Sequence, residues 1–214
     1  MQRTFTALAV AAVTVATTVA ATVPTTVPTT VPTTAAAAPA ASAATTRAPG
    51  FGYHKVRAGV PAHAARFRVE SPDLAAGRFP ATAFSNGFGC TGKNIAPRLR
   101  WSGAPVGTKS FAVTMFDRDA PTGSGFWHWA VRGIPASATS IPENVTAGAN
   151  DTGEAGYLGP CPPAGDRPHR YEVTVLALDV ADAGVPRNAT PALASFALSS
   201  HVIGYARITA TVKR

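Results

Sequence analysis

The chain has 214 residues, of which 14% are charged, and its formal net charge is +8 at pH 7. The basic residues after position 50 are spread singly, without a Lys/Arg run or a basic-aromatic alternation, which disfavours nucleic-acid binding and leaves a mild attraction to anionic ligands. The composition changes near residue 50, and the remainder is long enough for one well-cored domain.

Residues 1–22 have the features of a secretory signal peptide. Arg3 precedes an apolar stretch that begins at Phe5 and is rich in alanine and valine, and small residues such as Ala20 offer cleavage positions. Threonines interrupt the stretch, which favours cleavage over its alternative, retention as a membrane anchor. We therefore expect a secreted or cell-envelope protein without stable transmembrane insertion.

Residues 23–50 repeat the tetrapeptide TTVP and then become rich in alanine. Proline at every fourth position removes amide donors, and threonine and alanine cannot supply a core. This segment is expected to be a disordered linker, so the folded domain should span residues 51–214.

Beyond residue 50, short segments alternate apolar with polar residues or run apolar, and residues rich in Gly, Pro and Asn separate them. The pattern predicts strands at residues 67–71, 110–116, 128–134, 170–180 and 205–213. One helix should begin at Pro191, with Thr190 as its cap and Gly204 at its stop. The regular turn spacing favours a mostly β domain, an antiparallel β-sandwich with one or more short helices.

The two cysteines, Cys90 and Cys161, lie in separate loops rich in glycine and proline. In an exported protein this favours a disulfide, which would close a loop of about seventy residues and stabilise the fold by roughly 4 kcal/mol. The alternative is a metal site that adds His128 and His169, but no CxxC or HxxxH spacing supports it. We expect no metal and no other cofactor.

Polar residues gather where the predicted strands begin and end. They are Asp117, Asp119, His128, His169, Arg170 and Tyr171. Polar groups at neighbouring strand ends can converge on one rim of a sandwich, where loops leave a cleft. As rim residues, they should contribute little to the core.

Two segments, SFAVTMFDRDAPTGSGFWHWAVRGIP (110–135) and GYLGPCPPAGDRPHRYEVTVLAL (156–178), closely resemble the phosphatidylethanolamine-binding protein family, in its bacterial Raf-kinase-inhibitor-like branch. The resemblance runs from about Phe67 to the C-terminus, and it implies an antiparallel β-sandwich with a small anion-binding cavity at one edge. The implied cavity residues are Asp117, Asp119, Pro121, His128, Gly159, Pro160, Cys161, Pro162, Pro163, His169, Arg170 and Tyr171.

The resemblance favours a binding module for a small anion or a phosphoethanolamine-like head group, which some relatives extend to the inhibition or regulation of a partner protein. Phosphate needs donors and ammonium needs an acceptor. We expect His128, His169 and Tyr171 to donate, Asp117 to accept, and the tryptophans on either side of His128 to limit water. A carboxylate beside an imidazole should raise its pKa, so binding should strengthen at mildly acidic pH.

Hydrolysis is the alternative function, with the aspartate and histidine side chains as general acid and base. Ser124 does not lie in a Gly-x-Ser-x-Gly elbow and Cys161 is expected to be oxidised, so we assign no catalytic residue. Arg118 stands where the family often has proline and adds a cation beside the aspartates. The chain ends at Arg214, so we expect no counterpart of the tyrosine-bearing C-terminal helix of mammalian relatives.

Overall fold

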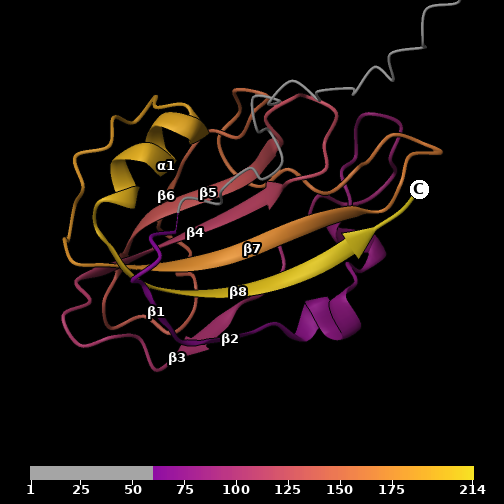
Figure 1. Ribbon diagram of the computed structural model, residues 1–214. Coiled ribbons are helices and arrows are strands. Elements are labelled where there is room, and N and C mark those ends of the chain that lie inside the picture. Colours follow the sequence, from indigo (N-terminus) through magenta and orange to yellow (C-terminus); the bar gives the residue numbers. More distant parts are fainter. Residues whose placement is uncertain (1–59) are drawn as a thin grey trace, which may run out of the picture. The chain divides into compact units, whose positions relative to one another are not determined.

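The computed structural model describes residues 60–214, so the predicted signal peptide (1–22) and linker (23–50) lie outside the described residues. A six-stranded sheet, in the order β1-β8-β7-β4-β5-β6, dominates the domain, and β2 and β3 form a second sheet (Figure 1). The strands are β1 (Ala65–Arg66), β2 (Arg68–Glu70), β3 (Arg100–Ser102), β4 (Ser110–Asp117), β5 (Phe126–Pro135), β6 (Thr146–Ala147), β7 (His169–Leu178) and β8 (Val202–Val212). The mostly β prediction is confirmed.

The main sheet is mixed, because β1 pairs parallel to β8 while the other neighbours pair antiparallel. The prediction of a purely antiparallel sheet is therefore wrong at this edge. A strand of two residues is too short to show a period-two pattern, so neither the strand nor its parallel pairing can be predicted from the sequence. In the described chain, the second sheet contains only two strands of three residues each. Turns and the short 3-10 helices η1 (Pro72–Gly77) and η2 (Ala81–Ala83) occupy the sequence between these strands.

The α-helix, α1 (Pro191–Ser199), begins where the sequence predicts. The Thr190 side chain accepts a hydrogen bond from the backbone N–H of Leu193 and caps the first turn. The helix ends at Ser199, so the prediction of Gly204 as its stop is wrong. Gly204 lies in β8, where a Cβ atom would come within 2.6 Å of Pro105 Cγ, and close packing explains the glycine.

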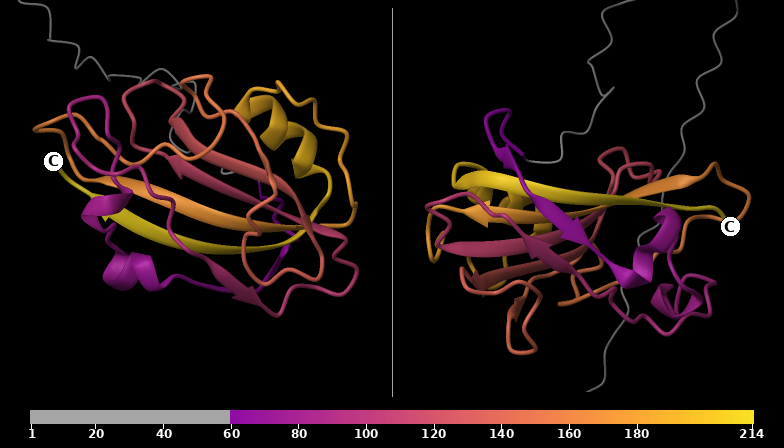
Figure 2. Two further views of the ribbon diagram at one scale, coloured as in Figure 1. Left: turned by 180° about the vertical axis from the view of Figure 1, so that it is seen from behind. Right: turned by 90° about the horizontal axis from the view of Figure 1, so that it is seen from below.

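Two apolar clusters cover the two faces of the main sheet. Successive residues of a strand face opposite sides. Accordingly, Phe111 and Val113 of β4 and Val175 of β7 join the larger cluster on the side of β2 and β3, whereas Ala112 and Leu176 join the cluster beneath α1. Figure 2 shows α1 and the β2-β3 pair on opposite sides of the sheet. Odd-numbered residues of β4 and β7 therefore face β2 and β3, and even-numbered residues face α1.

Candidate ligand-binding cavity

Neighbouring strands bring acidic and aromatic side chains together at one end of the main sheet. Asp117, the last residue of β4, pairs with Tyr171 of β7 and with Phe126 of β5. Asp117, Tyr171 and His169 are odd-numbered and therefore lie on the side of β2 and β3. Each is at most 2% exposed. The expectation that these residues contribute little to the core is wrong, because their side chains are buried.

His128 reaches the same place because β5 bulges there. In the pairing with β4, Phe116 lies opposite Trp127 and Met115 lies opposite Trp129, which leaves His128 as the extra residue. A bulge of this kind re-aims a side chain.

The rings that surround His128 fix its orientation. Its ring meets Tyr171 edge-on, with centroids 5.2 Å apart, and Phe126 lies 4.8 Å away. The tryptophans that flank His128 do not line the cavity, so the prediction that they limit water there is wrong: Trp127 packs on Phe116 and Trp129 packs on Tyr157.

A cavity of about 430 Å³ opens at these strand ends. The predicted residues that line it are Asp117, Pro121, His128, Gly159, Cys161, Pro162, Pro163, His169 and Tyr171. The lining residues that sequence reasoning missed are Phe88, Ala120, Thr122, Phe126, Leu158, Ala164 and Arg214. Phe88 lies two residues before Cys90, so the predicted disulfide loop could have indicated it.

Asp119 and Arg170 do not line the cavity, contrary to prediction. The backbone N–H, Nε and Nη2 groups of Arg170 donate to the Asp119 carboxylate at 2.9 to 3.1 Å, and Arg167 adds an ion pair at 3.3 Å. The hydrogen bond from the Arg170 side chain holds the pKa of the Asp119 carboxyl below its usual value. This carboxylate therefore joins the loop after β4 to the start of β7 and does not line the cavity.

Pro160 also lies away from the cavity, because it is buried and its carbonyl accepts from the Ser85 backbone N–H at 3.3 Å. Arg118 faces the other side of the sheet, where its Nη1 donates to Glu172 at 3.0 Å. The positive charge of Arg118 is thus neutralised on the face opposite the cavity.

The loop formed by residues 159–163 is held by a contact that only glycine permits. A Cβ atom at Gly159 would lie 2.2 Å from the Ala83 carbonyl oxygen, and the Gly159 N–H donates to Asn94 Oδ1 at 2.6 Å. The Cys90–Cys161 disulfide is present and ties the same two segments together. Both sulfurs are therefore unavailable to the alternative Cys/His metal site, and residues 60–214 contain no cluster of three His, Cys, Asp or Glu side chains arranged to hold a metal.

His169 lies between two carboxylates. Its Nδ1 is 2.7 Å from Asp117 Oδ2, and its Nε2 is 3.1 Å from Asp166 Oδ2. Because an ionised carboxylate only accepts, both ring nitrogens are placed to donate, an arrangement that favours the imidazolium form of His169. Burial by itself lowers the pKa of His169, but the hydrogen bonds to the two carboxylates outweigh it and raise that pKa.

His128 shows the opposite behaviour. Burial lowers its pKa to about 4, although hydrogen bonding to Leu158 and the charge of Asp117 act in the other direction. Nδ1 lies 3.0 Å from the Leu158 carbonyl oxygen, so the proton is assigned to Nδ1 and the other nitrogen of the neutral ring is an acceptor. The charge of Asp117 acts on the pKa of His128 in the expected direction, but burial outweighs it, so His128 is not an anion donor at neutral pH; the expected rise in pKa is found at His169.

Tyr171 and Arg214 are hydrogen-bond donors that line the same cavity. The Tyr171 hydroxyl is buried and has no hydrogen-bond partner within 3.5 Å among residues 60–214, although Asp117 and the Cys161 backbone lie near enough to interact with it more weakly. Burial and the charge of Asp117 raise its pKa, which keeps it protonated. The Arg214 guanidinium lines the cavity, with Nη1 at 3.1 Å from the Phe88 carbonyl oxygen and 2.9 Å from Cys161 Sγ. Arg214 lies beyond the last strand, where no periodic pattern could indicate its position.

Comparison with known proteins identifies the family of the chain. The profile of the phosphatidylethanolamine-binding protein family matches residues 70–213, so the chain belongs to this family, as the sequence motifs predicted. Escherichia coli YbcL is 45% identical over 161 residues, which cover 69% of this chain and 88% of YbcL. The crystal structure of YbcL, described as a new member of the mammalian family, matches with a TM-score of 0.67 at 42% identity over 70% of this chain and 99% of that one.

A further relative comes from Mycobacterium tuberculosis. LppC of Mycobacterium tuberculosis, whose name describes a lipoprotein, is 40% identical over 129 residues, which cover 58% of this chain and 63% of LppC. Within residues 60–214, no helix is both long enough and apolar enough to cross a membrane.

Proposed function

We propose that the chain is a non-catalytic binding protein that holds a phosphoethanolamine-like head group in the cavity of Asp117, His128 and Tyr171. The buried, unpartnered hydroxyl of Tyr171 carries this proposal. A buried donor without a partner costs about 1–3 kcal/mol, and a ligand oxygen would recover that free energy.

The cavity offers a separate place for each charge of a zwitterion. Tyr171 and Arg214 donate to the phosphate, and the His169 imidazolium adds positive charge beside it. The Asp117 carboxylate and the acceptor nitrogen of neutral His128 receive the ammonium group. This division replaces the sequence-based assignment in which both histidines donate to the anion.

The alternative function, hydrolysis, lacks a free thiol or aliphatic hydroxyl in the cavity lining, and the one carboxylate there, Asp117, is paired with His169. Cys161 is bonded to Cys90, and the Thr122 hydroxyl donates to the Gly125 carbonyl. Among the residues that line the cavity, only Cys161 carries a cysteine sulfur and only Thr122 carries an aliphatic hydroxyl. The lining therefore favours binding over covalent catalysis.

The test is calorimetric titration with O-phosphoethanolamine, inorganic phosphate and ethanolamine. We expect Kd for O-phosphoethanolamine in the micromolar to millimolar range, because few atoms are buried. Tyr171→Phe removes only the unpartnered hydroxyl, so the fold should persist while phosphoethanolamine and phosphate bind at least fivefold more weakly. Tyr205→Phe, on a partly exposed residue of β8 (Val202–Val212) outside the cavity, is the control for a lost hydroxyl and should bind normally.

Three results would decide against the proposal: no saturable binding, undiminished binding by the Tyr171→Phe protein, or release of phosphate from the ligand. The double replacement of His128 and His169 by alanine is a poorer test, because both rings are buried and their loss would unfold the site. Loss of binding in that variant would not separate recognition from folding.

We also propose that the protein is exported, with residues 1–22 removed. The apolar stretch after Arg3, the disulfide and the lipoprotein relative support this location. N-terminal sequencing of protein from the native host should find a mature start after the apolar stretch in the secreted or envelope fraction. A cytoplasmic pool that retains Met1 would contradict export.

A further inference from the structure

A second cavity, of about 280 Å³, lies at the opposite end of the same strands, and we call it the arginine cavity. Ser110, the first residue of β4, lines it, whereas Asp117 at the other end of β4 lines the first cavity. At about 3.3 Å per residue these two positions lie roughly 23 Å apart. Leu178 of β7, which pairs with Ser110, lines the arginine cavity and faces α1. The two cavities are therefore on opposite faces as well as at opposite ends.

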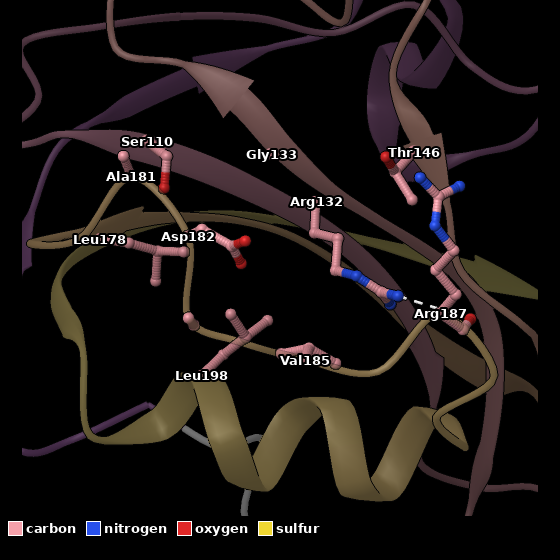
Figure 3. A pocket seen from close by; sticks show the side chains of 11 residues that line it. Ser110, Arg132, Gly133, Thr146, Leu178, Ala181, Asp182, Val185, Arg187 and Leu198 are labelled. Atoms are coloured by element: carbon pink, nitrogen blue, oxygen red, sulfur yellow. Dashed lines mark hydrogen bonds between the residues drawn. The ribbon is translucent and has the colours of Figure 1, made fainter.

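Two guanidinium groups line the arginine cavity, Arg132 of β5 and Arg187 of the loop before α1 (Figure 3). Arg132 Nη2 donates to the Pro186 carbonyl at 2.8 Å, which fixes that side chain against the loop. Within residues 60–214, neither arginine has a carboxylate within ion-pair distance. Asp182 also lines the cavity, but its Oδ1 accepts from the Gly184 N–H at 2.9 Å. Two cations and one engaged carboxylate leave an excess of positive charge.

One side of the lining is apolar. Leu178 and Leu198 are buried members of the cluster beneath α1, and Val185 packs against that cluster. Figure 3 shows Leu198 and Val185 on the helix side, facing the space that Arg132 enters. The Ser110 hydroxyl already donates to the Val180 carbonyl at 2.6 Å, so it does not compete for a ligand. A ligand with a charged end and an apolar end thus meets a matching surface at both ends.

We propose that the arginine cavity binds a small organic acid, with its carboxylate on Arg132 and Arg187 and a short apolar tail against Leu178 and Leu198. A planar guanidinium matches the geometry of a carboxylate, which favours this anion. An inorganic anion would leave the leucine surface uncovered, and an uncharged molecule would leave the two cations without a partner. The cavity is small, which limits the tail to a few carbons.

NMR titration of the 15N-labelled protein with hexanoate tests the proposal. We expect saturable shifts of the Ala183 and Val185 amides at millimolar hexanoate, with Tyr171 at the other cavity unmoved. Hexan-1-ol and inorganic phosphate should each bind at least threefold more weakly, because each matches one end of the cavity, and hexylammonium should not bind.

Arg187→Gln should raise the Kd for hexanoate at least threefold without unfolding the protein, since Arg187 is exposed. Arg100→Gln removes the same charge from an exposed site on β3 outside both cavities, and its Kd should match the wild type. Equal affinity for hexanoate and hexan-1-ol, an unchanged Kd in Arg187→Gln, or no saturable shift at Ala183 would each overturn the proposal.

Discussion

Nδ1 of His169 lies 2.7 Å from Oδ2 of Asp117, although 52 residues of chain separate the two side chains. Both side chains are almost fully buried, so each is the main compensation for the other's charge. Removing one partner of such a pair is costly because the remaining charge loses its compensation in a region that water does not reach. The pair joins β4 to β7 at the cavity and belongs to the core as much as to the site.

Replacement of Asp117 by Asn should lower the pKa of His169 and destabilise the fold by about 3 kcal/mol. The pKa of His169 is raised in the folded protein, so its stabilisation is present below the unfolded pKa and is lost as pH rises through the folded pKa. The loss in Asp117→Asn should therefore be largest at acidic pH. NMR titration of the His169 ring protons and urea unfolding at several pH values measure the two effects.

Asp166→Asn is the matched control, because Asp166 contacts the other nitrogen of the same ring from a more exposed position. It should also lower the pKa of His169, by a smaller amount than Asp117→Asn, since the hydrogen bond to Asp117 contributes more. A larger fall in Asp166→Asn would contradict the importance given to the buried pair.

The Cys90–Cys161 disulfide closes a loop with a sequence separation of 71 residues. Replacing both cysteines by alanine should lower the free energy of unfolding by about 4 kcal/mol, because the unfolded chain regains the entropy of the open loop. Urea unfolding of this variant beside wild-type protein, both without reductant, measures the difference. Wild-type protein treated with dithiothreitol should approach the variant. An unchanged midpoint in the double variant would show that the bridge contributes little.

Arg214 supplies permanent positive charge to the first cavity, a role that neutral His128 cannot fill at pH 7. Arg214→Gln should weaken O-phosphoethanolamine binding about three- to tenfold at low salt, and less at high salt because ions screen the interaction. Its neighbour Lys213 is exposed and does not line the cavity, so Lys213→Gln is the matched control and should bind normally. Equal losses in both variants would indicate general charge attraction in place of a direct contact.

The sequence predicted those strands that are long and regularly patterned. β4, β5, β7 and β8 each have eight or more residues, and burial of one or both faces leaves a clear apolar pattern in each of them. Of the strands with two or three residues, β2 was predicted within residues 67–71, whereas β1, β3 and β6 are too short for alternation to be recognised. The parallel edge and the reduced second sheet depend on these short strands, which is why both were missed.

The grouping of Asp117, His128, His169 and Tyr171 could be anticipated, because each lies at or near the end of a predicted strand. Their charge states could not be anticipated from the sequence. The pKa of a histidine depends on how completely the folded chain removes it from water and on which atoms remain as partners. The sequence places a carboxylate near both rings, yet only His169 gains two carboxylate contacts, while His128 loses water to Tyr171 and Phe126.

His128 should make the protein sensitive to acid between pH 6.5 and 4. Burial lowers its pKa from 6.5 to about 4, so the folded state binds this proton less readily than the unfolded state does. The contribution of neutral His128 to the free energy of unfolding is therefore present above its unfolded pKa of 6.5. It is lost as pH falls toward the folded pKa of about 4, by up to about 3 kcal/mol.

His128→Asn separates this effect from other titrations, because its amide can donate to the Leu158 carbonyl as Nδ1 does but gains no proton in this range. Between pH 6.5 and 4 the free energy of unfolding of His128→Asn should fall less steeply than that of the wild type. His169 contributes with the opposite sign, but it is common to both proteins and cancels in the comparison. Urea unfolding at pH 7.5, 5.5 and 4 gives the two curves, and parallel curves would mean that His128 titrates normally and is not the source of the acid sensitivity.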